Sequence, residues 1–564
     1  MKSHVLHKKR EFRDVRALIE WAGEFYHDRY AFSFRPDPHK PEKTKISFPA
    51  MRDDVRALAT EFISRGFSKK HLVIIGKNSY EWAIVYYASL AADAVLIPLD
   101  RDWGEAELAD TVKRAGADFL ICDKDIKAKG EFVVSEIGLG EITALIGEEG
   151  EGSLSALIEK GREKFNENPD LYFNNEVDPH KMSLLVFTSG TTGKGKGVML
   201  SQNNFLSDLS DIIPYMDFGI KTVGVLPPHH TYGSSVMFIG HAMIGSEIYI
   251  SSGLRYVSKE LREEKPLHLV AVPLYLETFY RKIRANIKEK GKEKLVAKMI
   301  KISNFLVKIG IDLRKKFFKE IRAAFGGEIK MIISGGAPIN PEILDFFNAI
   351  GINTLNGYGI TECAPIIAVN RSRNVVKGSV GNVLNIDTVI IDEPNEDGEG
   401  EILVKGPNVM LGYFNDEKAT KEAMTEDGYF RTGDYGKLTK DGILYITGRK
   451  KNLIILSNGK NVYPEEIESE LLATPGVQDI IVYEGKSRRG MEYNAIVAEV
   501  YPDKEYIEKN KIEDVKAHLQ PYINAYNKTA VPYKKIAILK VRDEDFPKNT
   551  LRKIMRFKLD MTID

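Results

Sequence analysis

Between residues 53 and 123, helical patterns alternate with short apolar runs, and this alternation limits the fold more than any other feature of the sequence. The amphipathic segment 53–66 precedes HLVIIG, the segment 80–93 precedes AVLIPL, and the segment 106–116 precedes ADFLICD. Short apolar runs between helices are typical of strands buried on both faces, and strand–helix–strand units form parallel sheets. The first half therefore predicts an α/β fold with helices on both faces of a parallel sheet.

The sequence pattern changes in the second half of the chain. From about residue 378, short strand patterns alternate with Gly- and Asp-rich turns, as in GEGEILVKGP and KDGILYITGRKKN, which predicts a small barrel-like antiparallel subdomain. After residue 452 a further set of helix and strand patterns is long enough for an independent α+β domain. We therefore expect a large N-terminal domain over 1–451 and a smaller C-terminal domain over 452–564.

Composition excludes several classes of protein. The 564 residues carry 80 Lys and Arg against 80 Asp and Glu, so no global charge favours a nucleic-acid partner. The two cysteines, Cys122 and Cys363, lack a metal-binding spacing and fit a reducing compartment. The charged start MKSHVLHKKREFRDV does not resemble a secretory signal, and the apolar window 82–99 is interrupted by Asp93 and Pro98. We expect a cytoplasmic protein.

The run LVFTSGTTGKGKGVML (185–200) places glycines, hydroxyl side chains and lysines between two apolar segments. Backbone N–H groups, hydroxyls and ammonium groups together predict a phosphate cradle. A Walker A loop would match from Gly190 to Lys196, but Gly197 stands where its magnesium-binding hydroxyl belongs. The sequence also continues as an apolar extended run, and a helix N-cap first occurs at Ser201. Both features exclude a Walker loop.

The loop resembles that of the adenylate-forming superfamily, which includes acyl- and aryl-CoA synthetases, luciferases and nonribosomal-peptide adenylation domains. Residues 188–197 depart from the pattern [ST]-S-G-[ST]-[ST]-G-x-P-K-G only at Gly195, where proline is usual. Further segments that resemble the family's motifs follow in order: LPPHHTYG (226–233), SGGAPI (334–339), YGITE (358–362), GEILVKGPNVMLGYF (400–414), YFRTGDYG (429–436), GRKKNLIILSNGKNVYPEEIE (448–468) and FPKNTLRKIMR (546–556). The resemblance spans nearly the whole chain and is greatest to bacterial long-chain fatty acyl-CoA synthetases.

The resemblance implies a two-step ligase. A medium- to long-chain fatty acid and ATP would give acyl-AMP and pyrophosphate with Mg²⁺, and the thiol of coenzyme A would then displace AMP. The acceptor could instead be the phosphopantetheine of an acyl carrier protein. A luciferase-like oxidation shares the first step, but nothing in the sequence favours it, and the intact motifs argue against a non-enzymatic role.

The resemblance also implies residue roles. The phosphates would be held by Thr188, Ser189, Gly190, Thr191, Thr192, Gly193 and Lys196, and the adenine by Gly335, Gly336, Ala337, Tyr358 and Gly359. Asp434 and Arg449 would bind the ribose, Glu362 would bind Mg²⁺, Thr361 would contact the α-phosphate, and His230 would shape the acyl pocket near the carboxylate.

The C-terminal domain would be mobile about a hinge at Lys451, where the family carries Asp or Lys. It would place Lys553 between the substrate carboxylate and the α-phosphate, and then bring the loop around Gly459 to the path of the thiol. Three flanking residues depart from the pattern: Asn452 replaces an acidic residue, Asn549 a threonine and Arg552 a glycine.

Residues 281–325 contain fifteen Lys and Arg against four Asp and Glu. Apolar residues recur there at spacings of three and four, which predicts one helical face ended by Gly326 and Gly327: Ile302, Leu306, Ile309, Leu313, Phe317, Ile321 and Ala324. The apolar face could lie on an anionic membrane or pack on the protein's own large domain. The basic residues could instead bind an acidic carrier protein.

Overall fold

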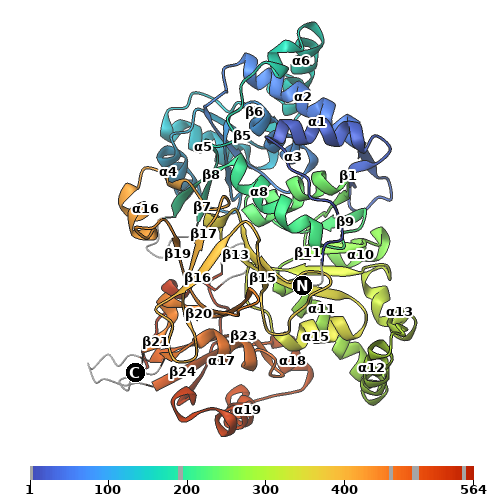
Figure 1. Ribbon diagram of the computed structural model, residues 1–564, viewed down its shortest axis with the longest axis vertical. Helices are drawn as coiled ribbons and strands as arrows, with labels where there is room; N and C mark the ends of the chain where they lie inside the picture. Colours follow the sequence, from blue (N-terminus) through green and yellow to red (C-terminus); the bar gives the residue numbers. More distant parts are fainter. Residues whose placement is uncertain (1–3, 189–194, 456–460, 486–494, 549–553, 564) are drawn as a thin grey trace.

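The computed structural model describes residues 4–188, 195–455, 461–485, 495–548 and 554–563. Figure 1 shows an elongated molecule in which the N-terminal α/β elements lie at one end and the C-terminal elements at the other. Strands of the middle of the chain lie between these two ends. The mixed α/β fold predicted from the sequence is confirmed.

The first sheet contains the alternating strands predicted from the sequence. Its seven strands run in the order β18-β8-β7-β4-β3-β5-β6, with β7, β4, β3, β5 and β6 mutually parallel. Their bounds are β3 His71–Ile75, β4 Val95–Leu99, β5 Phe119–Asp123, β6 Ala144–Ile146, β7 Met182–Thr188, β8 Lys196–Ser201 and β18 Gly412–Tyr413. Around this sheet lie α2 Phe48–Ser64, α3 Tyr80–Ala91, α4 Glu105–Ala115, η1 Lys124–Ile126, α5 Lys127–Ile137, α6 Leu154–Glu167 and α7 Asp170–Phe173. Every residue of β4 is buried, which is why its sequence is continuously apolar.

A second, four-stranded sheet has the order β2-β1-β10-β9, where only β2 is antiparallel to its neighbour. Its strands are β1 Tyr30–Phe34, β2 Thr44–Ser47, β9 Lys221–Gly224 and β10 Glu247–Ile250. The helical elements before and between these strands are α1 Val15–Phe25, α8 Gln202–Ile212, η2 Ile213–Tyr215, the π-helix η3 Tyr232–Gly240, α9 His241–Ile244 and, after β10, α10 Val257–Glu264. α8 and η3 contribute residues that line a cavity described below.

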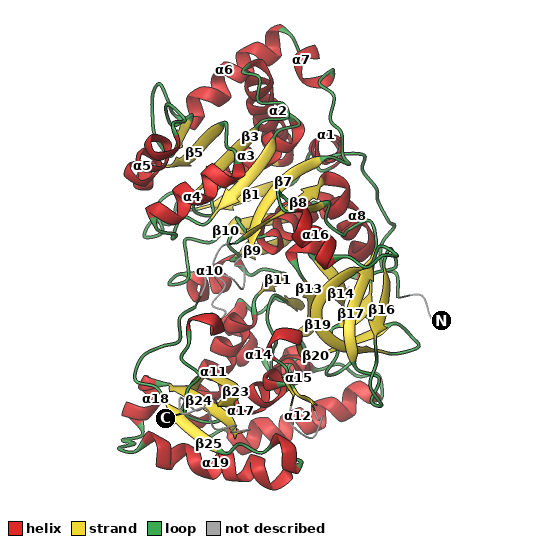
Figure 2. Ribbon diagram, turned by 90° about the vertical axis from the view of Figure 1, so that its left-hand side faces the viewer, coloured by secondary structure: helices red, strands yellow, loops and turns green. Residues whose placement is uncertain are grey.

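The third sheet joins parallel and antiparallel strands. Its order is β11-β12-β13-β14-β15-β20-β19-β17-β16; β11 to β13 are parallel and the later pairs antiparallel. The strands are β11 His268–Ala271, β12 Met331–Ser334, β13 Asn353–Gly359, β14 Ile366–Val369, β15 Gly381–Val383, β16 Thr388–Asp392, β17 Gly400–Lys405, β19 Phe430–Leu438 and β20 Ile443–Arg449. α15 Pro341–Ala349, η5 Thr361–Cys363 and α16 Glu417–Ala423 connect them. The antiparallel strands curl into the barrel-like shape seen in Figure 2.

The C-terminal part begins after η6 Lys450–Asn452 and has its own apolar core, which includes Ile454, Val482 and Leu539. It contains β21 Ile454–Ile455, β22 Asn461–Val462, α17 Pro464–Leu471, β23 Val477–Gly485, β24 Ala495–Pro502, α18 Lys504–Lys509, α19 Val515–Thr529, η7 Pro532–Lys534, β25 Ile538–Val541 and η8 Arg556–Lys558. It contacts the N-terminal part directly: the Asn340 side-chain amide donates to the Ser469 carbonyl at 3.2 Å.

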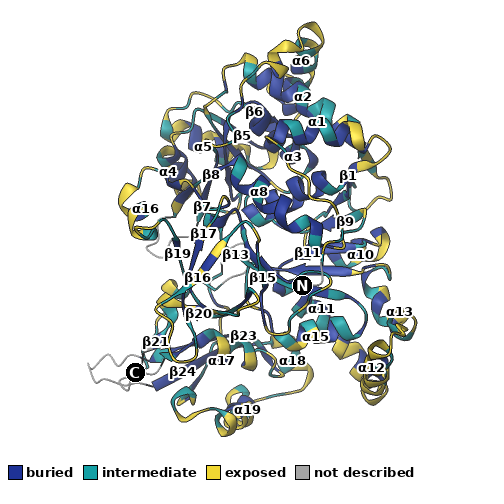
Figure 3. Cartoon of the chain, in the orientation of Figure 1, coloured by how far each residue is buried: buried dark blue, intermediate teal, exposed yellow. Residues whose placement is uncertain are grey.

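The basic segment is broken rather than one continuous helix. It forms α11 Pro273–Glu289, α12 Glu293–Lys308, α13 Arg314–Phe317, α14 Lys319–Arg322 and η4 Ala323–Phe325. α12 ends where Gly310 adopts φ +85° and the Asp312 carboxylate accepts from the Arg314 backbone N–H. The seven apolar residues therefore do not share one face. Figure 3 shows large exposed areas on α12. Among the described residues, no helix combines the length and apolarity needed to cross a membrane.

Candidate functional site

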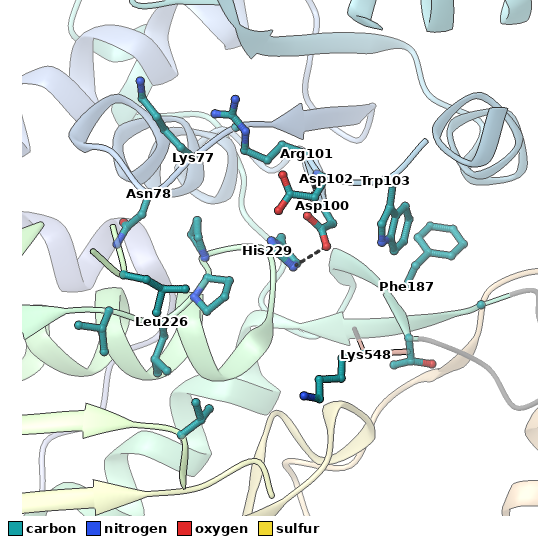
Figure 4. A pocket seen from close by; sticks show the side chains of 18 of the residues that line it. Lys77, Asn78, Asp100, Arg101, Asp102, Trp103, Phe187, Leu226, His229 and Lys548 are labelled. Carbon is teal, nitrogen blue, oxygen red and sulfur yellow. Dashed lines mark hydrogen bonds and ion pairs between the residues drawn. The ribbon is translucent and has the colours of Figure 1, made fainter. Parts of the chain in front are cut away.

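One large cavity, the outer cavity, has a volume of about 890 Å³ and lies between the N-terminal sheets and the C-terminal part. Figure 4 shows Asp100 and Arg101 on one side of it and Lys548, from the C-terminal part, on another. Thr188 and Gly195, which flank residues 189–194 of the phosphate loop, also line this cavity. Positively and negatively charged side chains from distant parts of the chain therefore line one cavity.

The described ends of the phosphate loop are held by strand pairing. Thr188 ends β7 and lies opposite Lys196, the first residue of β8. The Arg114 guanidinium donates to the Gly195 carbonyl at 2.9 Å, which ties the loop to α4. Ser201 then caps α8 in a capping box with Asn204, so a strand separates loop and helix, unlike a Walker loop. Ser189, Gly190, Thr191, Thr192 and Gly193 lie outside the described residues.

Lys196 is connected to Glu362 through Tyr413. The Lys196 ammonium lies 4.6 Å from the centre of the Tyr413 ring, and the Tyr413 hydroxyl donates to Glu362 Oε1 at 3.0 Å. Tyr413 reaches this position because β18 pairs with β8. Burial raises the pKa of Glu362, although the hydrogen bond from Tyr413 lowers it. Thr361 precedes Glu362 in η5. The sequence analysis missed Tyr413, although the motif GEILVKGPNVMLGYF contains it.

Tyr358, Asp434 and Arg449 form a second cluster. The Tyr358 hydroxyl donates to Asp434 Oδ2 at 2.7 Å, and Arg449 Nε lies 3.1 Å from Asp434 Oδ1. Asp434 and Arg449 face each other across the hairpin of β19 and β20, which explains how two motifs that are neighbours in sequence converge. The Asp434 carboxylate raises the pKa of Arg449, and burial of the guanidinium opposes this rise. Burial and the same carboxylate raise the pKa of Tyr358.

A smaller cavity, the inner cavity, has a volume of about 80 Å³ and an almost wholly apolar wall. Gly335, Gly336, Tyr358 and Gly359 line it. A side chain at Gly359 would place its Cβ 1.7 Å from the Pro365 carbonyl oxygen, and Gly336 has φ +89°, so both positions require glycine. Ala337 instead lines a third cavity, which is described below as the interdomain cavity.

The two adjacent histidines, His229 and His230, lie between β9 and η3. His229 lines the outer cavity, and its Nε2 lies 3.7 Å from the buried Asp100 carboxylate. Burial lowers the pKa of His229 to about 4. The His230 ring lies 4.3 Å from that of His229, and neither histidine is among the described residues of the inner cavity wall. Tyr232, from the same motif LPPHHTYG, lines the inner cavity.

The third, interdomain cavity has a volume of about 740 Å³ and is lined by Ala337, Arg449 and Lys451. Partial burial and the charge of Arg449 lower the pKa of Lys451. Lys548 and Met555 line both this cavity and the outer cavity. They flank residues 549–553, so Lys553 lies outside the described residues, as does Gly459.

The described residues contain no cluster of three or more His, Cys, Asp and Glu side chains able to hold a metal ion. The hard oxygen ligand Glu362 suits Mg²⁺, which usually keeps several waters and binds one or two carboxylates together with substrate phosphates. The site therefore fits a cation that arrives with a phosphate-bearing substrate.

Two family models match the chain. The model of AMP-binding enzymes matches residues 19–414, and the model of the AMP-binding enzyme C-terminal domain matches residues 451–560.

Curated relatives and solved structures extend these matches. The long-chain-fatty-acid–CoA ligase FadD15 of Mycobacterium bovis is 29% identical over 78% of this chain and 75% of its own length. The human long-chain-fatty-acid–CoA ligase 6 is 30% identical over 79% of this chain and 68% of its own length. ATP-bound MatB from Rhodopseudomonas palustris has the same fold, with a TM-score of 0.75 and 23% identity over 96% of this chain and 97% of that one.

Proposed function

Because the chain belongs to the AMP-binding enzyme family, we propose that it activates a medium- to long-chain fatty acid with ATP and transfers the acyl group to coenzyme A. One observation carries the proposal: the two ends of the phosphate loop and the residues on either side of 549–553 line the same outer cavity. A charged cavity and an apolar cavity in one molecule suit a substrate with an ionic head and a hydrocarbon tail.

We propose that Asp434 and Arg449 bind the ribose, with the Asp434 carboxylate accepting from its hydroxyls. The Tyr358 ring supports the adenine, beside the backbone of Gly335, Gly336, Ala337 and Gly359. Lys196 and the loop residues 188–193 hold the β- and γ-phosphates. The short contact from Tyr358 to Asp434 supports this arrangement because it fixes the nucleotide-facing groups relative to one another.

Glu362 would hold Mg²⁺, which supplies charge neutralisation to the triphosphate when bound. Tyr413 orients the Glu362 carboxylate through its hydroxyl, and Thr361 donates to the α-phosphate or the adenylate. The chain between 549 and 553 would bring the Lys553 ammonium to the bridge between carboxylate and α-phosphate, where positive charge offsets the repulsion between two anions.

We propose that the chain divides at residues 1–451 and 452–564, with Lys451 at the hinge. Separate apolar cores on the two sides of this boundary support the division. Rotation of the smaller domain would withdraw Lys553 and bring the loop around Gly459 to the thiol. His230 would lie next to the acyl carboxylate. The alternative acceptor is the phosphopantetheine of an acyl carrier protein, and the test below separates the two thiols.

We also propose a cytoplasmic enzyme that contacts the inner face of the membrane through 281–325. Exposed apolar side chains concentrate at the end of α12 and the following turn, including Phe305 at 63% and Ile309 at 57% exposure. Lysines such as Lys301 and Lys308 accompany them. Apolar and basic groups together complement an anionic bilayer.

Vesicle sedimentation tests this contact. The double variant Phe305→Ser/Ile309→Ser should lose binding to anionic vesicles, whereas Phe173→Ser, on the distant helix α7, should bind as the wild type does. Equal binding of all three proteins would contradict a membrane role, and loss of self-association in the double variant would indicate a second copy of the chain instead.

ATP–pyrophosphate exchange tests the function. Acetate, octanoate, palmitate and benzoate are supplied separately, and each active acid is then offered coenzyme A or a holo acyl carrier protein. We expect exchange with octanoate or palmitate and thioester formation on coenzyme A. Exchange confined to acetate or benzoate would reject the substrate class, and thioester formation only on the carrier protein would favour the alternative.

A further inference from the structure

The inner cavity lies between helical segments and the third sheet. Its walls come from α8 and η2, from the π-helix η3 and α9, and from the ends of β12 and β13 with the start of β14. Among the described lining residues, polar side chains come only from Tyr232, His241 and Tyr358. The cavity is small, at about 80 Å³. Small changes in its wall should therefore have large effects on what it holds.

Gly240, at the end of η3, is a glycine that its backbone does not require. Its φ of −58° and ψ of −42° are helical values that any residue adopts. A Cβ at this position would meet only Leu209 Cδ2, at 3.7 Å, which is an ordinary contact. Gly233, in the same π-helix, differs, because its Cβ would lie 1.9 Å from the Pro227 carbonyl oxygen. The missing side chain of Gly240 therefore leaves open space at the cavity wall.

Next to Gly240, His241 presents a ring whose hydrogen bonds are complete. Its Nδ1 lies 3.2 Å from the Val236 carbonyl, which only accepts, so Nδ1 carries the proton. His268 Nδ1 accepts from the Gly219 backbone N–H at 3.2 Å, so the proton of His268 is on Nε2. That proton is donated to His241 Nε2 at 2.9 Å.

This chain of hydrogen bonds requires both rings to be neutral, since a second proton on either would set two donors against each other. Burial agrees, because it lowers the pKa of His241 to about 4 and the pKa of His268 well below its ordinary value. Because the His241 ring is neutral and both of its nitrogens already have hydrogen-bond partners, it has no donor left for a charged group. It is a surface on which a methyl or methylene group can pack without leaving a polar atom unpaired.

We infer that Gly240 and His241 set the depth and the end-group selectivity of the acyl pocket, so that the substrate is a monocarboxylic acid with an apolar end. The inference rests on the proposed function and names the substrate feature that this wall selects. Gly240 provides the space beside Leu209 through which the hydrocarbon tail passes. The locked pair of His241 and His268 rejects a second carboxylate, which would be desolvated there without a partner.

The experiment compares chain-length profiles in ATP–pyrophosphate exchange over straight-chain acids from butyrate to palmitate. Gly240→Val fills the space and should lower exchange with the longest active acid, relative to the shortest, by about tenfold or more. Met216→Ala, which enlarges the same wall, should raise that ratio. If Gly240→Val does not fold, Gly240→Ala gives a smaller shift in the same direction.

Matched controls separate specificity from stability. Gly104→Val also adds a side chain to a glycine, one with nothing within 4 Å of its Cβ. Met51→Ala removes a methionine that is as buried as Met216, at 1% exposure each. Both controls should keep the wild-type profile. Unshifted profiles in Gly240→Val and Met216→Ala, with exchange still present, would overturn this inference alone.

The end-group selectivity is tested on the wild-type enzyme with an active monocarboxylate and the dicarboxylate of equal length. We expect at least a hundredfold weaker exchange with the dicarboxylate. Equal exchange with the two acids would overturn the selectivity assigned to the histidine pair. Absence of exchange with every acid would overturn the proposed function and, with it, this inference.

Discussion

The outer and inner cavities differ in size, in chemistry and in the origin of their walls. The outer cavity, at about 890 Å³, is lined by ionisable side chains such as Asp100, Arg101 and Lys548 from both parts of the chain. The inner cavity, at about 80 Å³, is apolar and lies wholly within residues 209–369. The difference suggests a division of labour: charge placement in the outer cavity governs rate, and shape in the inner cavity governs which acid is used.

Tyr358 lies at the boundary of this division. Its ring lines the inner cavity, while its hydroxyl bonds to Asp434. Variants on the charged side should lower exchange by the same factor for every acid, and variants on the apolar side should change the ratio between acids. The following predictions test that division, from the largest expected effect to the smallest.

Replacement of Lys553 by alanine should have the largest effect. Loss of the positive charge expected at the carboxylate and α-phosphate should reduce exchange by about 1,000-fold, equally for all acids. ATP binding, measured by equilibrium dialysis, should change little. An equal loss of ATP binding would contradict the proposed role, and Lys509→Ala, at an exposed lysine of α18, serves as the control.

Asp434→Ala should reduce exchange by about 100-fold, because it removes the carboxylate that pairs with the Arg449 guanidinium and that we propose as the ribose acceptor. The loss should fall mainly on the KM for ATP and should be the same for short and long acids. Asp441→Ala, at the exposed turn between β19 and β20, should be neutral. A change in the chain-length profile of Asp434→Ala would break the separation between the cavities.

Tyr413→Phe should reduce exchange about tenfold, the effect expected for one hydrogen bond to a charged group. The ring that contacts Lys196 is kept, so the variant isolates the hydroxyl that orients Glu362. The magnesium concentration for half-maximal activity should rise in this variant. It should stay at the wild-type value in Tyr429→Phe, whose ring faces Lys405 at the end of β17.

The smallest effect concerns stability at the interdomain cavity. Burial and Asp479 raise the pKa of Glu277 to about 7, opposed by Arg281. The folded state then holds a proton that the unfolded state releases, so the free energy of unfolding falls as pH rises from the usual glutamate pKa to about 7.

Glu277→Gln should therefore raise the melting temperature at pH 8 by about 2 °C and change it much less at pH 5. Exposed Glu289, on the same helix, gives the matched control Glu289→Gln, which should leave the melting temperature unchanged at both pH values. A gain for Glu277→Gln at pH 5 equal to that at pH 8 would contradict a cause in its ionisation.

The sequence by itself determined the elements whose pattern is local. The alternation over 53–123 predicted the parallel strands β3, β4 and β5, since strands buried on both faces must be continuously apolar. The extended run after the phosphate loop and the cap at Ser201 were also predicted, because capping depends on residues only three positions apart. Motif order alone indicated the family.

The basic segment shows where local pattern was not sufficient. Spacings of three and four between 302 and 324 fitted one helix, but Gly310 and the Asp312 side chain end α12 and start a new turn. Periodicity reports which residues could share a face; it does not report whether the backbone continues.

Only the tertiary structure decided which distant residues meet. Strand pairing brings Tyr413 to Lys196, and no local signal marks Tyr413 as a partner of Glu362. Tertiary packing also left space at Gly240 and locked His241 against His268. These contacts join residues far apart in the chain, so they depend on how the sheets and helices pack, which the order of residues specifies only through the complete fold.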